Sequence, residues 1–165
     1  MESFIFLPPI LRSMTRRKTA ISTLRYYGGA VKRCWSQPIA CTLFSSSKGN
    51  CTYVKNGGEE FLIDAGVSLR SLECALSALG TSPKNLRCIF ITHEHSDHIK
   101  GVMNAMKKYG LTVYAPYMSR RVMINSDPAA EDIIPFDEGL PADICLTETG
   151  VTPFRTPHDA MGSVC

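Results

Sequence analysis

Residues 93–98 contain the densest group of metal-ligand side chains in the chain. Three histidines and one aspartate, His93, His95, Asp97 and His98, stand there in the order H-x-H-x-D-H. Imidazole nitrogens together with a carboxylate oxygen suit zinc and are also compatible with manganese or iron. A lone histidine is more often structural, but four such groups in one polar loop would be costly to arrange without a ligand. The spacing therefore predicts a site that can hold two divalent ions.

The elements on either side explain how such a loop could be positioned. Residues 88–92 form an apolar run that predicts a buried strand, and a helix is predicted over 99–109, where Gly110 ends it. A strand that runs into a loop and then into a helix can direct the first two histidines toward one ion. The aspartate and the third histidine, at the turn into the helix, can then face a second ion.

From Pro38 onward, short apolar runs alternate with helix-like segments, which is the pattern of an α/β protein. Residues 45–50 predict a tight polar turn, and residues 56–58 predict a hairpin, so three antiparallel strands open the domain. Ser68 predicts the N-cap of the first helix, which Gly80 ends. The other predicted elements are strands over 40–44, 51–54, 60–63, 111–114, 132–136, 143–146 and 151–155, and a short helix over 118–124.

Composition limits the class of protein. Of the 165 residues 44% are apolar, and no apolar run approaches the 18 or more residues that a membrane span requires. One soluble globular domain without a membrane partner is therefore expected. Residues 38–165 contain eleven Lys or Arg and fourteen Asp or Glu, a charge of −3, so no basic nucleic-acid surface is visible in the body.

The N-terminal segment, residues 1–37, differs from the body because it contains seven Lys or Arg and one acid. Three interpretations stand side by side: a disordered basic extension, an organelle transit peptide, and an overlong gene start with Met14 or a later residue as the true beginning. The domain boundary is placed after residue 37.

The seven cysteines are odd in number and include no C-x-x-C pair. Several lie inside apolar runs, so they are predicted to be free thiols that pack in the core, and none is offered as a metal ligand. Free thiols favour a reducing compartment, and the cytoplasm is the expected location, with organelle targeting by residues 1–37 as the alternative.

Four motifs, taken in order, resemble the metallo-β-lactamase fold, and within it the YycJ/WalJ branch of bacterial nucleases. The signature of the fold is H-x-H-x-D-H after a buried strand, and only this motif is highly specific alone. The resemblance covers residues 38–163 and implies an α/β fold, the αββα sandwich of that family. Its motifs are the opening turn at 45–51, an acidic motif at 61–66, the metal loop at 92–101 and a further histidine motif at 156–160.

The resemblance also implies roles for individual residues. Asp97 would bind metal and orient the nucleophile, and Asp64 would orient a ligand without binding metal itself. The residues alone leave alternatives open, since Asp64 could cap a turn, His158 could be a surface histidine, and residues 45–50 could be a plain hairpin. The implied ligands are His93, His95 and His158 for the first ion and Asp97 and His98 for the second, with Ser46, Lys48 and Asn50 as phosphate contacts.

The implied reaction is hydrolysis of a phosphodiester in DNA or RNA, as in an exonuclease, by a hydroxide that bridges two divalent ions. Zinc is the expected metal and manganese the alternative. A second interpretation is a hydrolase of the same fold that acts on a thioester, a lactone or a β-lactam, because fold and metal site do not determine the substrate.

A third interpretation is a catalytically incomplete metal-binding fragment. The family supplies a bridging Asp and a last His from a second half, and these have no counterpart here. Residues 38–165 are therefore expected to form a truncated domain, the first half of the sandwich plus part of the centre. The sheet face left uncovered would favour self-association and low stability.

Overall fold

Two hairpins build the first half of the sheet, as the turn residues predict. The computed structural model describes residues 37–137, 144–157, 159, 160 and 162–165, so the predictions for residues 1–36 lie outside the described residues. Strands β1 (Ile39–Ser46), β2 (Gly49–Asn56) and β3 (Glu59–Ile63) pair antiparallel. Gly57 has a φ of 57°, which a two-residue hairpin turn requires. The first turn is shorter than the predicted residues 45–50, because Ser46 already pairs with Gly49 and only residues 47 and 48 lie between the strands.

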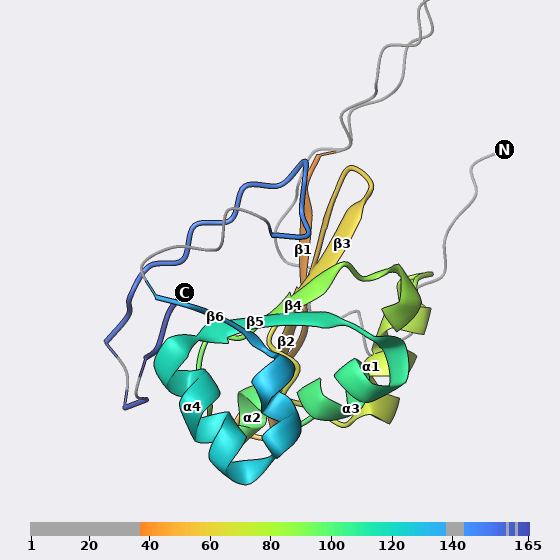
Figure 1. The fold of residues 1–165 in the computed structure, drawn as a ribbon. Helices are drawn as coiled ribbons and strands as arrows, with labels where there is room; N and C mark the ends of the chain where they lie inside the picture. Colours follow the sequence, from red (N-terminus) through yellow and green to blue (C-terminus); the bar gives the residue numbers. More distant parts are fainter. Residues whose placement is uncertain (1–36, 138–143, 158, 161) are drawn as a thin grey trace, which may run out of the picture. The chain divides into compact units, whose positions relative to one another are not determined.

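The second half of the sheet is parallel. Strands β4 (Cys88–Phe90), β5 (Thr112–Pro116) and β6 (Ile134–Phe136) continue the sheet in the order β1-β2-β3-β4-β5-β6. Each parallel strand is reached through a crossover connection. Such crossovers are right-handed in nearly all proteins, and because each one here moves to the next strand on the same side, their helices lie on one face of the sheet. Figure 1 shows this arrangement. The helices are α1 (Leu69–Ala78), α2 (Ser96–Ile99), α3 (Val102–Tyr109) and α4 (Tyr117–Ser126), with short 3-10 turns at Pro83–Asn85 and Pro128–Asp132.

Alternation along the buried strands divides the apolar side chains between two cores. In β4, Ile89 faces the helices while Cys88 and Phe90 face the other way. The helix side holds the larger core, to which α1, α3 and α4 contribute Leu72, Leu76, Val102, Ala105 and Met123. The other face holds an aromatic cluster in which Phe90 meets Phe61 edge-on and stacks on Tyr114, with ring centroids 5.6 and 5.2 Å apart.

The aromatic face was expected to be uncovered, and the structure corrects this expectation. Leu146 and Val164 pack on the aromatic cluster, and Phe61 is only 3% exposed. The buried carboxylate of Glu59 on β3 accepts backbone hydrogen bonds from Thr147 and Glu148 and so ties this covering to the sheet. Less apolar area is therefore open for self-association than the sequence suggested, and self-association remains a prediction.

Three predicted elements differ from the structure. The helix predicted over 99–109 is interrupted around Gly101, so α2 and α3 are separate. Ile144–Leu146 form no strand, and residue 143 lies outside the described residues. The strand predicted over 151–155 is reduced to a single bridge between Arg155 and Val164. Within the described ranges, none of the helices has the length and apolarity to cross a bilayer.

The buried carboxylate of Glu60 predicts a dependence of stability on pH. Burial raises the pKa of Glu60, but hydrogen bonds from Lys55, Thr81 and Tyr53 outweigh burial, and the net pKa lies below its ordinary value. A carboxyl group whose folded-state pKa is lowered adds stability above its unfolded pKa, and that stability is lost as pH falls through the folded value. Glu60→Gln should therefore cost about 1 to 3 kcal/mol at pH 7 and much less near pH 3.

Urea unfolding of the wild type and of Glu60→Gln at the two pH values measures this difference. Glu131→Gln, at an exposed position of the Pro128–Asp132 turn, is the matched control. An equal loss at pH 7 and pH 3 would show that the ionised carboxylate of Glu60 is not what stabilises the fold.

Candidate metal centre

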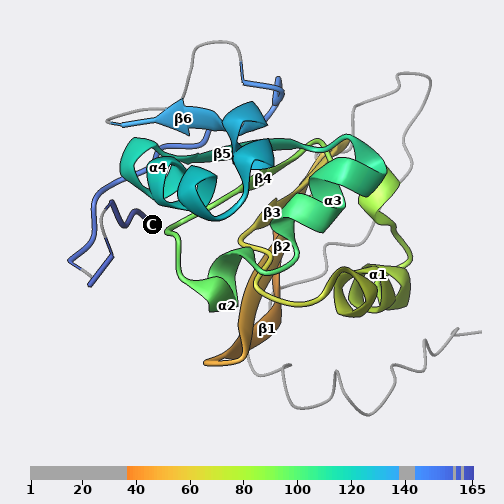
Figure 2. The same cartoon turned by 60° about the horizontal axis from the view of Figure 1, so that its bottom comes forward.

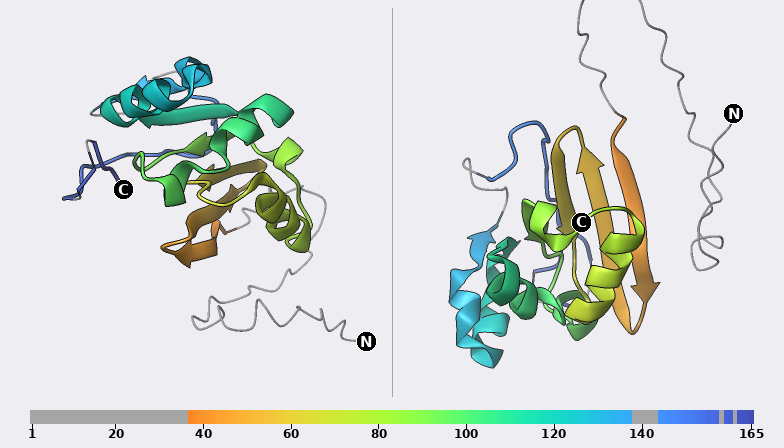
Figure 3. Two further views of the ribbon diagram at one scale, coloured as in Figure 1. Left: turned by 90° about the horizontal axis from the view of Figure 1, so that it is seen from below. Right: turned by 90° about the vertical axis from the view of Figure 1, so that its right-hand side faces the viewer.

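The four predicted ligands lie together where β4 ends and α2 begins. His93 is only 4% exposed, and its ring centroid lies 4.6 Å from that of His95 and 4.0 Å from that of His98. His95 is the N-cap of α2, and Asp97 and His98 follow in its single turn. Figures 2 and 3 show α2 beside the tip of the β1–β2 hairpin.

Asp64 forms hydrogen bonds to both ends of this loop. It follows β3, is buried, and has a φ of 61°, a left-handed conformation that aspartate tolerates better than most residues. One carboxylate oxygen of Asp64 accepts the backbone N–H of Thr92 at 2.8 Å, and the other lies 2.7 Å from Nδ1 of His98. The carboxylate thus joins the end of β4 to α2.

The same carboxylate determines which nitrogen carries the proton in two histidines. A carboxylate only accepts, so Nδ1–H of His98 donates to Asp64. The Thr92 hydroxyl donates its one hydrogen to Asp64 at 2.9 Å, so His93 Nδ1–H must donate to Thr92 Oγ1, also at 2.9 Å. In their neutral forms both rings therefore carry their lone pair on Nε2, the state that a metal ligand needs.

His98 is held in an electrostatically negative surrounding. Burial lowers the pKa of His98, but its hydrogen bond to Asp64 and the charges of Asp64 and Asp97 outweigh burial and raise the net pKa. Negative charge that favours a proton on this ring would also favour a cation beside it.

Asp97 and His98 are spaced like two ligands of one ion. Oδ2 of Asp97 lies 3.7 Å from Nε2 of His98. Two ligand atoms about 2.1 Å from a tetrahedral zinc are about 3.4 Å apart, so this pair and its donor chemistry fit a divalent metal. Among the residues that the structure describes, no three His, Cys, Asp or Glu side chains already converge as a metal-holding group. The predicted ligand His158 lies outside the described residues.

Three segments meet at Gly66 with no space for a side chain. Its N–H donates to the carbonyl of Asn50 at 2.8 Å, and a Cβ on Gly66 would lie 1.5 Å from the carbonyl oxygen of Asp97. A Cβ on Gly101 would lie 2.4 Å from the carbonyl oxygen of Val67. Backbone contact through these glycines holds β2, the turn after β3 and the metal loop against one another.

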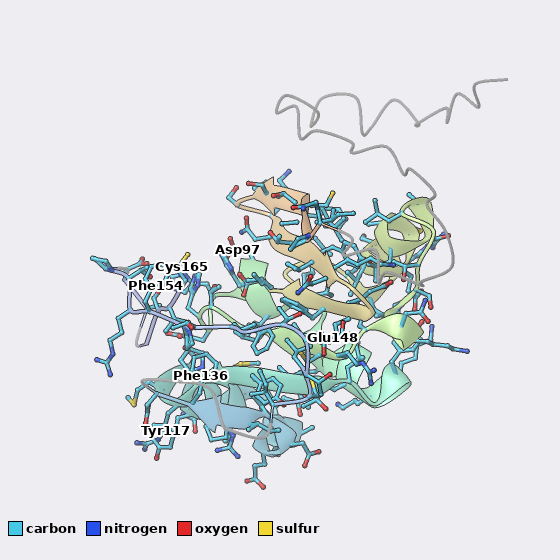
Figure 4. All side chains as sticks on the ribbon, turned by 90° about the horizontal axis from the view of Figure 1, so that it is seen from above. Asp97, Tyr117, Phe136, Glu148, Phe154 and Cys165 are labelled. Atoms are coloured by element: carbon cyan, nitrogen blue, oxygen red, sulfur yellow. The ribbon has the colours of Figure 1, made fainter. Side chains whose placement is uncertain are left out.

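The predicted substrate contacts divide into two groups. Ser46 and Lys48 are exposed at the tip of the β1–β2 hairpin, where Ser46 Oγ accepts the backbone N–H of Lys48. Asn50 is half-buried, and its amide faces Asp97 instead, at 2.9 Å from Oδ2. Figure 4 shows Asp97 at the same end of the molecule as this hairpin.

Two residues that bear on the site were not singled out from the sequence. Thr92 links His93 to Asp64, and its position directly before the first histidine was the available signal. Ser119 on α4 is buried and donates to Oε2 of Glu94 at 2.6 Å. This bond ties the metal loop to α4, and no local pattern predicts a partner 25 residues away.

The buried thiol of Cys51 supports the prediction that cysteines pack in the core instead of binding metal. Cys51 is 1% exposed, and burial, followed by the charge of Asp64, raises its pKa to about 12. A protonated thiol is a poor metal ligand. Cys88 is likewise buried and free, whereas Cys74 and Cys165 are free but exposed, so the prediction of core packing is wrong for these two.

Comparisons with known proteins agree with this arrangement. Residues 47–163 match the family described as the metallo-beta-lactamase superfamily. The exodeoxyribonuclease WalJ of Streptococcus pneumoniae serotype 2 (strain D39) is 40% identical over 84 residues, 51% of this chain and 31% of that protein. The exodeoxyribonuclease YycJ of Bacillus anthracis is 41% identical over 73 residues, 44% of this chain and 28% of that protein. The matched stretch thus spans about a third of the length of these curated relatives.

Solved structures agree on the fold. The subclass B3 metallo-beta-lactamase BJP-1 of Bradyrhizobium japonicum superposes with a TM-score of 0.62 at 19% identity, over 78% of this chain and 55% of that one. At this level of identity the likeness establishes the fold, and the α/β metallo-β-lactamase fold predicted from the sequence is confirmed, with one six-stranded sheet and its helices in the described residues.

Proposed function

Because the chain belongs to the metallo-β-lactamase superfamily, we propose that it contributes to a metal-dependent nuclease that hydrolyses phosphodiesters in DNA or RNA. The observation that carries the proposal is the loop of three histidines and Asp97, with two of its rings oriented through Asp64. The similarity to two exodeoxyribonucleases favours nucleic acid over the other substrates of the fold.

Two divalent ions, with zinc expected and manganese as the alternative, would be held by His93, His95 and His158 and by Asp97 and His98. When bound, such ions supply a hydroxide at neutral pH and neutralise charge on a phosphodiester. The role of Asp64 is to keep the ring of His98 in one tautomer and one orientation, which is what outer partners of metal ligands do.

Asp97 is the proposed catalytic residue of this chain. Its carboxylate is fixed by Asn50 and lies at the edge of the site, with its side chain 28% exposed. A carboxylate in this position can hold the proton of an attacking water or orient that water toward phosphorus. No other described carboxylate in the loop is placed to do so, because Glu94 faces Ser119.

Groups that could contact a substrate are proposed from exposure and charge. Ser46 and Lys48, at the hairpin tip, are the proposed phosphate contacts. A pocket of about 230 Å³ opens beyond β5 and β6, and the side chains of Tyr117, Phe136 and Arg155 help to line it. Aromatic rings with an arginine suit a nucleobase and its phosphate.

Two alternative functions stand beside this proposal. A hydrolase of the same fold that acts on a thioester, a lactone or a β-lactam would use the same metal loop. A metal-binding protein without turnover would bind the ions and release no product. The proposed location is the cytoplasm, with organelle targeting by residues 1–37 as the alternative.

The test is a metal-dependence assay on the 165-residue chain. Protein stripped with a chelator and then supplied with zinc or manganese is incubated with end-labelled single-stranded and double-stranded oligonucleotides. Release of labelled mononucleotides only after metal is restored would support the proposal. Metal binding without release from any oligonucleotide would favour the non-catalytic interpretation, and turnover of nitrocefin or a thioester alone would favour the other hydrolases.

A further inference from the structure

Asn50 directs its side-chain amide into the metal loop and away from the outer surface of the hairpin. Its Nδ2 lies 2.9 Å from Asp97 Oδ2, 3.2 Å from His98 Nε2, 3.1 Å from the carbonyl oxygen of Ser46 and 3.5 Å from that of Asp97. A residue in the motif expected to bind phosphate is thus engaged with two predicted metal ligands.

The chemistry of these neighbours determines which way the amide points. The carboxylate and carbonyl oxygens only accept hydrogen bonds. Neutral His98 also accepts at Nε2, because its proton is on Nδ1 in the bond to Asp64; a bound ion would take that single lone pair and leave the Asp97 carboxylate as the acceptor for Asn50. Since every neighbour accepts, the NH₂ group and not the oxygen of Asn50 must face the loop, and its shortest contact is to the Asp97 carboxylate.

The backbone keeps Asn50 in this place. Asn50 pairs with Ser45 in the hairpin, and its carbonyl accepts the N–H of Gly66 at 2.8 Å. Gly66 also packs against the backbone of Asp97. The distance between Asn50 and Asp97 is therefore set by contacts between backbone atoms, which cannot rotate away as a side chain could. The exposed Lys48, two residues earlier, has no such constraint.

We propose that Asn50 is a positioning residue for metal binding, which orients the Asp97 carboxylate beside His98, and that it does not contact the substrate phosphate. The inference rests on the proposed metal site. Asn50 would do for Asp97 what Asp64 does for His98, and the two ligands of one ion would each have an outer partner from a different strand end. A ligating carboxylate that lacks such a partner typically binds metal 10- to 100-fold more weakly.

The experiment measures metal affinity directly. Stripped wild-type chain, Asn50→Ala and Asn56→Ala are titrated with Co²⁺, and binding is followed by visible absorption. Asn56 is the matched control, because it is the same residue type at the other end of β2 and donates to Thr149 Oγ1 instead. Asn50→Ala should bind Co²⁺ about 10- to 100-fold more weakly than the wild type, and Asn56→Ala should bind it equally well.

A double-mutant cycle shows whether Asn50 acts through Asp97. In an Asp97→Asn background, Asn50→Ala should cause no further loss of Co²⁺ affinity. If circular dichroism shows that Asn50→Ala is unfolded, Asn50→Ser replaces it, because serine keeps a polar group on the strand but is too short to reach Asp97.

Three outcomes are distinguishable. Unchanged Co²⁺ affinity in Asn50→Ala, with a raised KM for an oligonucleotide, would overturn the inference and return Asn50 to the substrate contacts. An equal loss of affinity in both backgrounds would also overturn it, because Asn50 would then not act through Asp97. Absence of Co²⁺ binding by the wild type would reject the proposed metal site itself.

Discussion

Replacing Gly66 by alanine is expected to lower the free energy of unfolding by about 3 kcal/mol or more and to disrupt the metal loop. The new Cβ would lie 1.5 Å from the carbonyl oxygen of Asp97 and 2.8 Å from the backbone nitrogen of Asn50. Both neighbours are backbone atoms, so no side chain can rotate away to relieve the overlap. The hairpin, the turn after β3 and the metal loop would have to separate.

Thermal unfolding followed by circular dichroism measures the effect, which should exceed about 10 °C for a domain of this size. Gly58→Ala is the matched control, because a Cβ there meets nothing within 4 Å. If Gly66→Ala melts within about 2 °C of the wild type, the close approach of the three segments is not what holds the site together.

Replacing Asp97 by alanine is expected to lower kcat on a labelled oligonucleotide by about 10²- to 10⁴-fold, the range for loss of a group that moves a proton in the transition state. The fold should survive, since Asp97 lies in the first turn of α2 with its side chain partly exposed. Metal affinity should fall as well, so turnover is measured at metal concentrations that saturate the variant.

Asp132→Ala provides the control, because Asp132 is an exposed aspartate at the end of the Pro128–Asp132 turn, and its activity should equal that of the wild type. Turnover by Asp97→Ala within threefold of the wild type at saturating metal would contradict the catalytic role of Asp97.

The elements that could be predicted from the sequence are those with a strong local signal. Residues 88–92 are apolar except for Thr92, and Cys88–Phe90 is buried on both faces of the sheet, as a central parallel strand requires. Ser68 does cap α1, with its side chain accepting the N–H of Ser71, and Gly110 does end α3 in the left-handed conformation. In each case one residue type and its neighbours determine the local backbone.

The failures lie where long-range contacts decide the conformation. Residues 144–146 and 151–155 have the composition of strands, but here residues 144–146 and Val151 pack against the aromatic face as a covering, and Glu59 holds this covering by accepting hydrogen bonds from Thr147 and Glu148. The break between α2 and α3 arises because Gly101 must approach the carbonyl of Val67. Neither contact leaves a periodicity that a sequence window could detect.

The loop of candidate ligands and the outer role of Asp64 were predicted from the motif and the resemblance, whereas the outer contacts of Thr92 and Asn50 were not. The order H-x-H-x-D-H identified the loop, but which atom faces which neighbour depends on Asp64, Thr92 and Asn50, two of them distant in sequence. A sequence motif gives the residue types of a site. Which atoms donate and accept hydrogen bonds there can be read only from the folded structure.

The strand order of the sheet also has a consequence for how the chain is made. Because the order in space is the order in sequence, each new strand joins the sheet at an edge beside a strand that has already left the ribosome. No strand needs to be inserted between two others, because each of the five pairings joins consecutive strands, two through short hairpins and three through crossovers. The contact of Glu59 with Thr147 spans 88 residues, so the covering of the aromatic face can form only after the six strands have emerged. Until then a nascent chain would expose Phe61, Phe90 and Tyr114 to chaperones.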